Sequence, residues 1–203
     1  MRRPNNYDEA KVQGEYTPVE LGGHKMVIKS VEERMTKTNR PMLAVYFDFA
    51  PGDKQAGYFM ESFKNDIRPD KKWPNQGTAY VVAEDAEGNC TSQLKTLCTC
   101  TEHSNAGFEC WKPDGTLDIV GMKNKLIGGV FGPQKDYYDG KVLDKRVFRW
   151  FMSIDKVAEA QIPRESETKA YRDYQEGHAQ MPSPDADGFM NIPDGIDEEL
   201  PFN

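Results

Sequence analysis

The chain has 203 residues and a formal net charge of −7, which fits one domain of ordinary size with flanking segments. Residues 163–203 hold ten acidic and three basic side chains, whereas residues 1–162 hold 23 of each. The acidic total therefore does not exclude a basic binding face, because binding depends on local potential. We find no signal peptide and no run of about 20 apolar residues that would span a membrane, so we expect a cytoplasmic protein without a membrane partner.

The N-terminal half predicts a polar arm followed by three strands. Residues 1–21 are mostly polar, so we expect an arm that is ordered only in part. Residues 24–35 and 41–50 then alternate apolar with polar or small side chains, which is the period of a strand with one buried face. Residues 57–64 predict a third strand, with aromatic side chains at Tyr58, Phe59 and Phe63.

A loop, a short strand and one core helix are expected next. Residues 65–77 are irregular and rich in basic and aromatic side chains, and residues 79–82 predict a short strand. The helix begins at Thr91 or Ser92, either of which can cap it. Its expected buried face consists of Leu94, Leu97, Cys98 and Thr101, and the sequence Asn105-Ala106-Gly107 ends it.

The last part of the body predicts two more strands. They cover residues 125–132 and 145–153, with the turn signal Asp139-Gly140 inside a longer polar loop between them. A short helix over residues 155–160 follows, and Pro163 ends the domain.

This order of elements predicts a mainly β fold, a β-barrel with one core helix. Three strands, a helix and two strands fit the OB-fold-like five-stranded barrel, whose open face and loops bind oligonucleotides. Other α+β sheets share this order and remain alternatives. We therefore divide the chain into an N-terminal arm (1–21), an OB-like domain (22–162) and a disordered acidic tail (163–203).

The end of the chain combines acidic side chains with a small apolar segment. From Asp185 onward there are six acids and no Lys or Arg. This composition suits a tail that docks into a basic-rimmed apolar pocket of another protein, and the alternative is a tail that only keeps the protein soluble. The predicted docking residues are Ile196, Asp197, Glu198, Glu199, Leu200, Pro201 and Phe202.

Both the tip and the body resemble known single-stranded-DNA-binding proteins. The tip is similar to that of bacterial and phage members, which end in acids followed by Leu or Ile, Pro and Phe, although here Asn203 follows Phe202. The body resembles members from phages and prophages of low-GC Gram-positive bacteria through Asn6-Tyr7-Asp8, Gly14-Glu15-Tyr16, Leu21-Gly22-Gly23, residues 43–48, Lys72-Trp73-Pro74, residues 102–108 and residues 126–132.

The resemblance implies an OB-type fold and binding of single strands without catalysis. It also implies a role in phage DNA replication or recombination, in the cytoplasm of a bacterial host, with replication or recombination enzymes recruited through the tip. It implies no cofactor. Sheet edges would allow a homo-oligomer, and the sequence does not select one.

Sequence-tolerant binding of a single strand needs cations for phosphates and aromatic faces for bases. We expect Arg149 and Phe151 to face outward, because Phe148, Trp150 and Met152 alternate with them as an apolar face. The full predicted DNA-binding set is Lys29, Tyr46, Arg68, Lys71, Lys72, Trp73, Lys135, Tyr137, Tyr138, Lys141, Arg146, Arg149 and Phe151.

A zinc site, a nuclease site and an adaptor function are the alternatives to this interpretation. The window of Cys90, Cys98, Cys100, His103 and Cys110 lacks the paired spacing of a zinc site, because Cys98 and Cys100 point to different sides of the expected helix. A metal-dependent nuclease would use Asp48, Glu61 and Lys64, but the last two should face opposite sides of a strand. A protein-interaction adaptor would share the tail but would not bind oligonucleotides.

Overall fold

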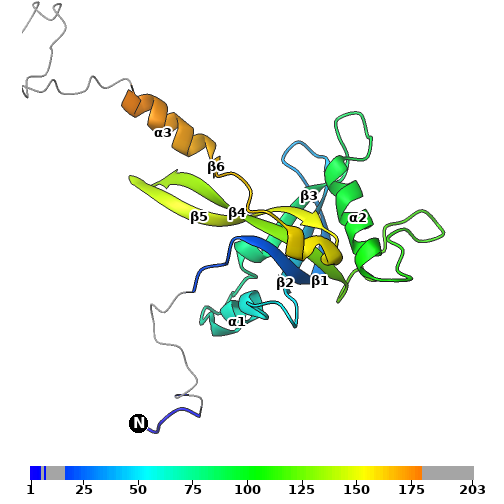
Figure 1. Ribbon diagram of the computed structural model, residues 1–203, viewed down its shortest axis with the longest axis horizontal. Coiled ribbons are helices and arrows are strands. Elements are labelled where there is room, and N and C mark those ends of the chain that lie inside the picture. The colour runs from blue at the N-terminus through cyan, green and yellow to red at the C-terminus, as the bar shows by residue number, and fades with distance from the viewer. Residues whose placement is uncertain (6, 8–16, 180–203) are drawn as a thin grey trace, which may run out of the picture. The chain divides into compact units, whose positions relative to one another are not determined.

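The computed structural model describes residues 1–5, 7 and 17–179, and its strands form one open sheet of mixed direction (Figure 1). The strand order is β3-β2-β1-β4-β5, and β6 pairs with β4 outside this path. The strands are β1 (Gly22–Met35), β2 (Pro41–Phe49), β3 (Thr78–Val82), β4 (Leu126–Tyr138), β5 (Lys141–Met152) and β6 (Ser166–Glu167). The helices are α1 (Tyr58–Asn65), α2 (Ser92–Ser104) and α3 (Lys169–Ala179), with 3₁₀ turns at Asn75–Gly77 (η1) and Ile154–Glu159 (η2).

The fold is therefore mixed α/β, and the closed five-stranded barrel predicted from the element order is wrong. The two ends of the strand path, β3 and β5, lie at opposite edges of the sheet in the described part of the chain. Closing a barrel requires enough strands, tilted and staggered to meet. The third predicted strand is missing because residues 58–65 form a helix.

The helix α1 replaces the strand expected over residues 57–64. Gly57 adopts a left-handed backbone conformation, with φ of 77°, directly before the first helical residue. The carboxylate of Asp48 then accepts hydrogen bonds from the backbone amides of Phe59, at 2.9 Å, and Met60, at 3.2 Å. An acidic group that accepts the first free amides of a helix stabilises its N-terminus. The aromatic pattern in this segment therefore follows helical rather than strand periodicity.

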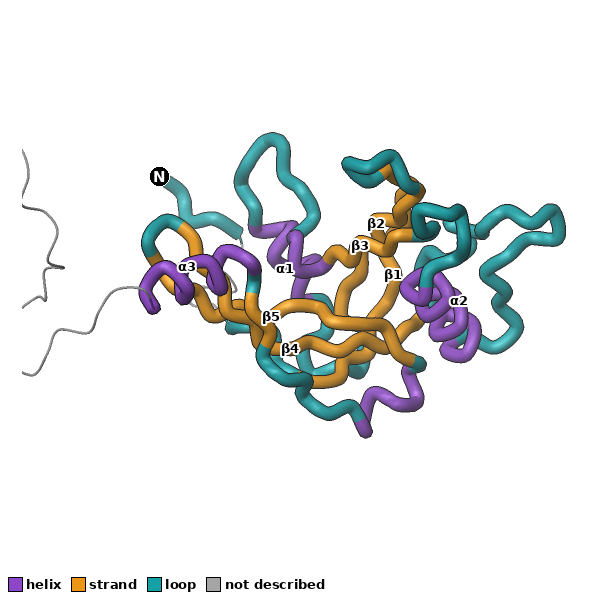
Figure 2. The backbone as a smooth tube through the Cα atoms, turned by 90° about the horizontal axis from the view of Figure 1, so that it is seen from above, coloured by secondary structure: helices purple, strands orange, loops and turns teal. Residues whose placement is uncertain are grey.

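The core helix α2 confirms the sequence prediction. The hydroxyl of Thr91 accepts a hydrogen bond from the amide of Leu94 at 3.2 Å, as an N-cap does. The four residues predicted for its inner face are all buried: Leu94, Leu97, Cys98 and Thr101. In both views α1 and α2 lie on either side of β1 and β2 (Figures 1 and 2).

The hairpin of β4 and β5 is longer than predicted. The strands extend to Tyr138 and from Lys141, so only Asp139 and Gly140 form the turn. Their φ angles are 49° and 75°, and two successive positive values define the tight turn that matches the twist of a hairpin. Asp139 and Gly140 therefore form the whole turn. The neighbouring residues, which were expected to lie in a longer loop, belong to the two strands.

Aromatic side chains fill the core between the sheet and its covering elements. Phe47, Phe49, Phe59 and Phe131 are each at most 1% exposed, and their rings meet mostly edge to face or tilted. Phe151 is also buried, at 5% exposure, so the prediction that it faces outward, on which its place in the DNA-binding set rested, is wrong. Phe148 packs against it with ring centroids 4.6 Å apart, although three positions separate them. Strict alternation therefore fails in this strand, and Trp150, expected inside, is 45% exposed.

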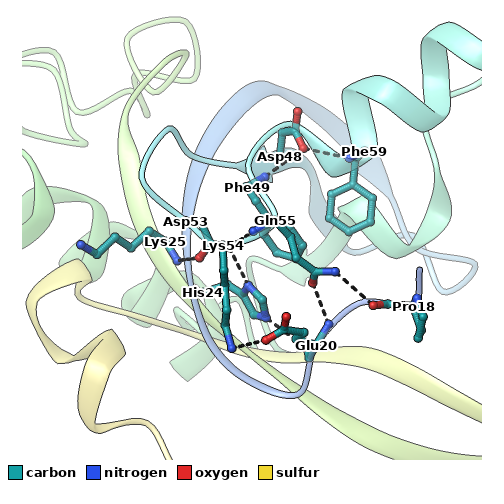
Figure 3. Close-up of polar contacts among 10 residues, drawn as sticks. All are labelled: Pro18, Glu20, His24, Lys25, Asp48, Phe49, Asp53, Lys54, Gln55 and Phe59. Carbon is teal, nitrogen blue, oxygen red and sulfur yellow. Dashed lines mark hydrogen bonds and ion pairs between the residues drawn. The ribbon is translucent and has the colours of Figure 1, made fainter. Parts of the chain in front are cut away.

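The N-terminal arm joins the core earlier than expected. Val19 is fully buried. His24 is also buried, and its ring stacks on that of Phe49 with centroids 4.2 Å apart (Figure 3). The ring nitrogens of His24 lie 3.1 Å from Asp53 Oδ1 and 3.0 Å from the carbonyl oxygen of Glu20. These polar contacts hold residues 17–21, which the sequence assigned to the arm, against the body.

The described chain divides into two compact units. The first comprises Met1–Pro133 and Lys145–Glu165, and the second comprises Gln134–Asp144 and the segment from Ser166 onward. Inside the second unit, β6 pairs in parallel with β4, and Tyr137 stacks on Tyr174 of α3 with centroids 4.0 Å apart. The tail predicted to be disordered from residue 163 thus begins with a strand, β6, and a helix, α3. The sequence of the tail did not predict them, because they form contacts with β4, a distant part of the chain.

Candidate nucleic-acid interface

An open groove of about 400 Å³ lies in the first unit, over the face of β1, β2 and β3 that points away from the core. Its strand residues alternate with buried ones such as Val31, Val45 and Ala79, so the groove occupies the opposite side of the sheet. The lining residues are Lys29, Ser30, Glu32, Arg34, Tyr46, Phe63, Lys72, Trp73, Asn75, Thr78 and Tyr80.

Two tyrosines present aromatic surface on the floor of this groove. Tyr46 of β2 lies opposite Thr78 of β3. Tyr80, two residues after Thr78, lies opposite Ala44, two residues before Tyr46. Diagonal neighbours of this kind are on the order of 7–8 Å apart on the same sheet face. Tyr80 is 52% exposed, while Ala44 beside it is buried. The floor therefore offers two ring surfaces on adjacent strands.

One wall of the groove is aromatic and is held rigidly. The indole nitrogen of Trp73 donates a hydrogen bond to the carbonyl oxygen of Gly77 at 3.0 Å. The indole ring also packs against Phe63 of α1, with centroids 5.7 Å apart. A side chain at Gly77 would collide with this arrangement, since a Cβ there would lie 2.7 Å from the indole nitrogen. The capped helix α1 and the bare Gly77 backbone together fix where Trp73 sits.

A hydrogen-bonded cluster lies on the floor next to Tyr46. Oε2 of Glu32 accepts hydrogen bonds from Arg34 Nη2 at 2.7 Å and from the Tyr46 hydroxyl at 2.9 Å. The Tyr46 hydroxyl in turn accepts from Arg34 Nη2 at 2.6 Å. The hydrogen bonds from Arg34 and Tyr46 lower the pKa of Glu32 below its usual value. Burial and the bond to Glu32 raise the pKa of Tyr46, so its hydroxyl keeps its proton.

The charge of the lining is positive. Three cations, Lys29, Arg34 and Lys72, face one carboxylate, that of Glu32. Within the described residues neither Lys29 nor Lys72 makes a hydrogen bond or ion pair. Cations without a protein anion, set beside aromatic rings that are at least partly exposed, are the combination that holds phosphates and stacks bases.

The groove brings together four residues of the predicted DNA-binding set and adds others. Lys29, Tyr46, Lys72 and Trp73 all line it. Sequence reasoning missed Arg34 and Glu32 because the pairing of β1 with β2 shifts register between Ile28 and Ser30. This bulge inserts Lys29 and moves the following residues of β1 to the outer face. Tyr80 was detectable, since it alternates with the buried pair Ala79 and Val81. Phe63 was obscured by the wrong strand prediction.

The remaining predicted cations of the first unit do not line the groove. Arg68 forms an ion pair with Asp66, with Nη2 to Oδ2 at 2.6 Å, and Lys71 lies over the ring of Phe63 at 5.6 Å. Arg146 donates a hydrogen bond to the carbonyl oxygen of Val19 at 2.6 Å, so it holds the N-terminal segment. The aliphatic part of Arg149 packs over Gly132, where an added Cβ would come within 3.2 Å of Cγ.

The predicted hairpin patch belongs to the second unit. Lys135 forms an ion pair with Asp144, and the Tyr137 ring is covered by the stack with Tyr174. Tyr138 is 73% exposed, and Lys141 beside the turn is exposed too. Of this patch, Tyr138 and Lys141 present open surface. The predicted docking residues 196–202 lie outside the described residues.

The residues weighed for metal chemistry have other surroundings. The carboxylate of Asp48 is 2% exposed and accepts from the amides of α1, while Glu61 and Lys64 are exposed on that helix. Cys98 and Cys110 are buried together, and the Cys110 thiol lies 3.5 Å from the Cys98 carbonyl oxygen. Among the described residues, no three His, Cys, Asp or Glu side chains are grouped so that they could hold a metal ion.

No protein-family model and no curated protein sequence matches this chain. In the described part of the chain, none of the helices has the length and apolar character needed to cross a membrane.

Proposed function

We propose that this protein binds single-stranded DNA through the groove over β1, β2 and β3, without strict sequence specificity, in phage or prophage DNA replication or recombination. The observation that carries the proposal is the lining itself. Two lysines whose side chains have no partner among the described residues adjoin the exposed ring of Tyr80 and the half-buried rings of Tyr46 and Trp73. Each stacked base contributes about 1–3 kcal/mol, and every base has a stackable face. The resemblance of the sequence to phage single-stranded-DNA-binding proteins supports the biological setting.

The groove suits a single strand better than a duplex. Its aromatic surfaces lie on the floor of an open sheet, where only unpaired bases can reach them. The lysines lie on different segments, Lys29 on β1 and Lys72 on the loop before η1, so phosphates can be held on more than one side. A duplex would present phosphates but keep its bases stacked inside.

In this proposal the acidic C-terminal tip recruits partner enzymes of replication or recombination. The support is its sequence, in which acids adjoin Leu200, Pro201 and Phe202. Deleting residues 185–203 is expected to leave DNA affinity unchanged or higher and to abolish partner binding. Weaker DNA binding after the deletion would show instead that the tail belongs to the binding domain.

The test is fluorescence anisotropy of a short labelled oligo-dT, titrated with the protein at low and moderate salt, with duplex and EDTA controls. The double variant Lys29→Ala/Lys72→Ala should bind more weakly. It should also flatten the plot of log affinity against log salt by about 1.4, because each lost phosphate contact accounts for about 0.7 on a single strand.

The matched control is Lys95→Ala/Lys123→Ala. This pair removes the same charge from two exposed lysines that do not line the groove. An equal loss of affinity in both double variants would point to general charge and remove the groove from the proposal. If the wild type fails to bind single strands at low salt, the DNA-binding function is wrong and the adaptor function takes its place.

A further inference from the structure

The carboxylate of Glu32, the one acidic group that lines the groove, uses only one of its two oxygens in hydrogen bonds with the described residues. All the hydrogen bonds that Glu32 accepts go to Oε2, from the guanidinium of Arg34 and the hydroxyl of Tyr46. In the described part of the chain Oε1 accepts none. The side chain is 52% exposed and lines the groove, so a donor on a ligand in the groove can reach this carboxylate.

A free carboxylate oxygen repels phosphate and attracts hydrogen-bond donors. Its place beside Tyr46 on the groove floor therefore disfavours the sugar-phosphate backbone there and favours base edges. Lys29 and Lys72, whose side chains have no partner in the part of the chain that the structure describes, are the groups that would hold the phosphates. The bases would then lie over the strands, within reach of Glu32.

We propose that Oε1 of Glu32 makes the groove prefer bases that carry an exocyclic amino group, cytosine above all, over uracil and thymine. This inference rests on the single-strand function proposed above. Carboxylates accept hydrogen bonds from the amino group at position 4 of cytosine. Uracil and thymine have a carbonyl oxygen at that position, whose partial negative charge the carboxylate repels. Their one donor on this edge, N3–H, lies between two carbonyl oxygens, so a carboxylate that approaches it meets the same repulsion.

Glutamine at this position should abolish or reverse the preference. Arg34 and Tyr46 both direct donors at the Oε2 position, so the amide oxygen of a Glu32→Gln side chain would occupy that place. The amide nitrogen would then replace Oε1 and turn an acceptor into a donor. A donor favours the carbonyl oxygen of uracil over the amino group of cytosine.

The experiment compares labelled oligo-dC and oligo-dU by anisotropy at about pH 8, well above the pKa of cytosine. Their bases differ at position 4, an amino group or a carbonyl oxygen, and at N3, which carries a proton only in uracil. The wild type should bind oligo-dC about tenfold more tightly, as one hydrogen bond to a charged group would produce. Glu32→Gln should bind oligo-dU equally or more tightly than oligo-dC.

Glu33→Gln is the matched control, because it makes the same charge change one residue away and outside the groove. It should keep the wild-type preference. Equal binding of oligo-dC and oligo-dU by the wild type, or an unchanged ratio in Glu32→Gln, would overturn the inference and leave the single-strand function standing. Failure of the wild type to bind either strand would overturn the function itself.

Discussion

Replacing Asp48 with alanine would show whether this carboxylate caps α1. The side chain is 2% exposed and accepts hydrogen bonds from the amides of Phe49 and Phe59 at 2.9 Å and of Met60 at 3.2 Å. Losing an N-cap costs about 0.5–2 kcal/mol, and leaving a buried donor without a partner costs about 1–3 kcal/mol. We therefore expect Asp48→Ala to lower the free energy of unfolding by about 3 kcal/mol.

That loss is large for a folded domain, whose total stability is about 5–15 kcal/mol. For a chain of this size it corresponds to a Tm lower by about 6–12 °C. Asp48→Asn should lose less, about 1 kcal/mol, because its remaining oxygen can still accept at the Oδ1 position. Since α1 carries Phe63, which supports Trp73, the alanine variant should also bind oligo-dT more weakly.

The assay is urea unfolding followed by tryptophan fluorescence and circular dichroism, with Asp70→Ala as control. Asp70 is exposed in the loop after α1, so its removal should change stability by less than about 0.5 kcal/mol. If Asp48→Ala unfolds at the same urea concentration as Asp70→Ala, the capping argument is wrong.

Two further changes test the groove wall and the buried polar network. Gly77→Ala should cost about 1–3 kcal/mol and weaken oligonucleotide binding, because its Cβ would lie 2.7 Å from the indole nitrogen of Trp73. Gly177→Ala, which has open space around it, should leave both the Tm and binding intact or slightly raise the Tm. Burial would raise the pKa of Asp53, but hydrogen bonds from a buried imidazole and two backbone amides outweigh it and hold the pKa below its ordinary 3.8. The ionised form thus stabilises the fold above pH 3.8, and this stability is lost as pH falls through the lower folded-state pKa. Asp53→Asn should flatten the acid limb of stability against pH in urea titrations, and an acid limb as steep as that of Asp70→Asn would contradict this.

The candidate site was only partly readable from the sequence. Lys29, Tyr46 and Trp73 were predicted correctly as lining residues, because each is a cation or an aromatic residue that lies outside the apolar face of its strand or in a polar loop. Glu32 and Arg34 were not found, because the bulge in β1 reverses which side chains face outward, and a bulge depends on the partner strand. The sequence did not reveal the hydrogen bond of Arg146 to Val19, because it joins distant parts of the chain. Phe151 was expected to face outward but is buried against Phe148, because strand alternation breaks there.

The sequence by itself determined the elements whose signals are local. The alternation of β2, the cap and buried face of α2 and the Asp-Gly turn are set by neighbouring residues, whose periodicity and φ preferences need no partner. Only the tertiary structure decided that residues 58–65 are a helix, because its cap comes from Asp48 on another element. It also decided that the sheet stays open and that α3 forms against Tyr137, because both depend on which surfaces are buried together.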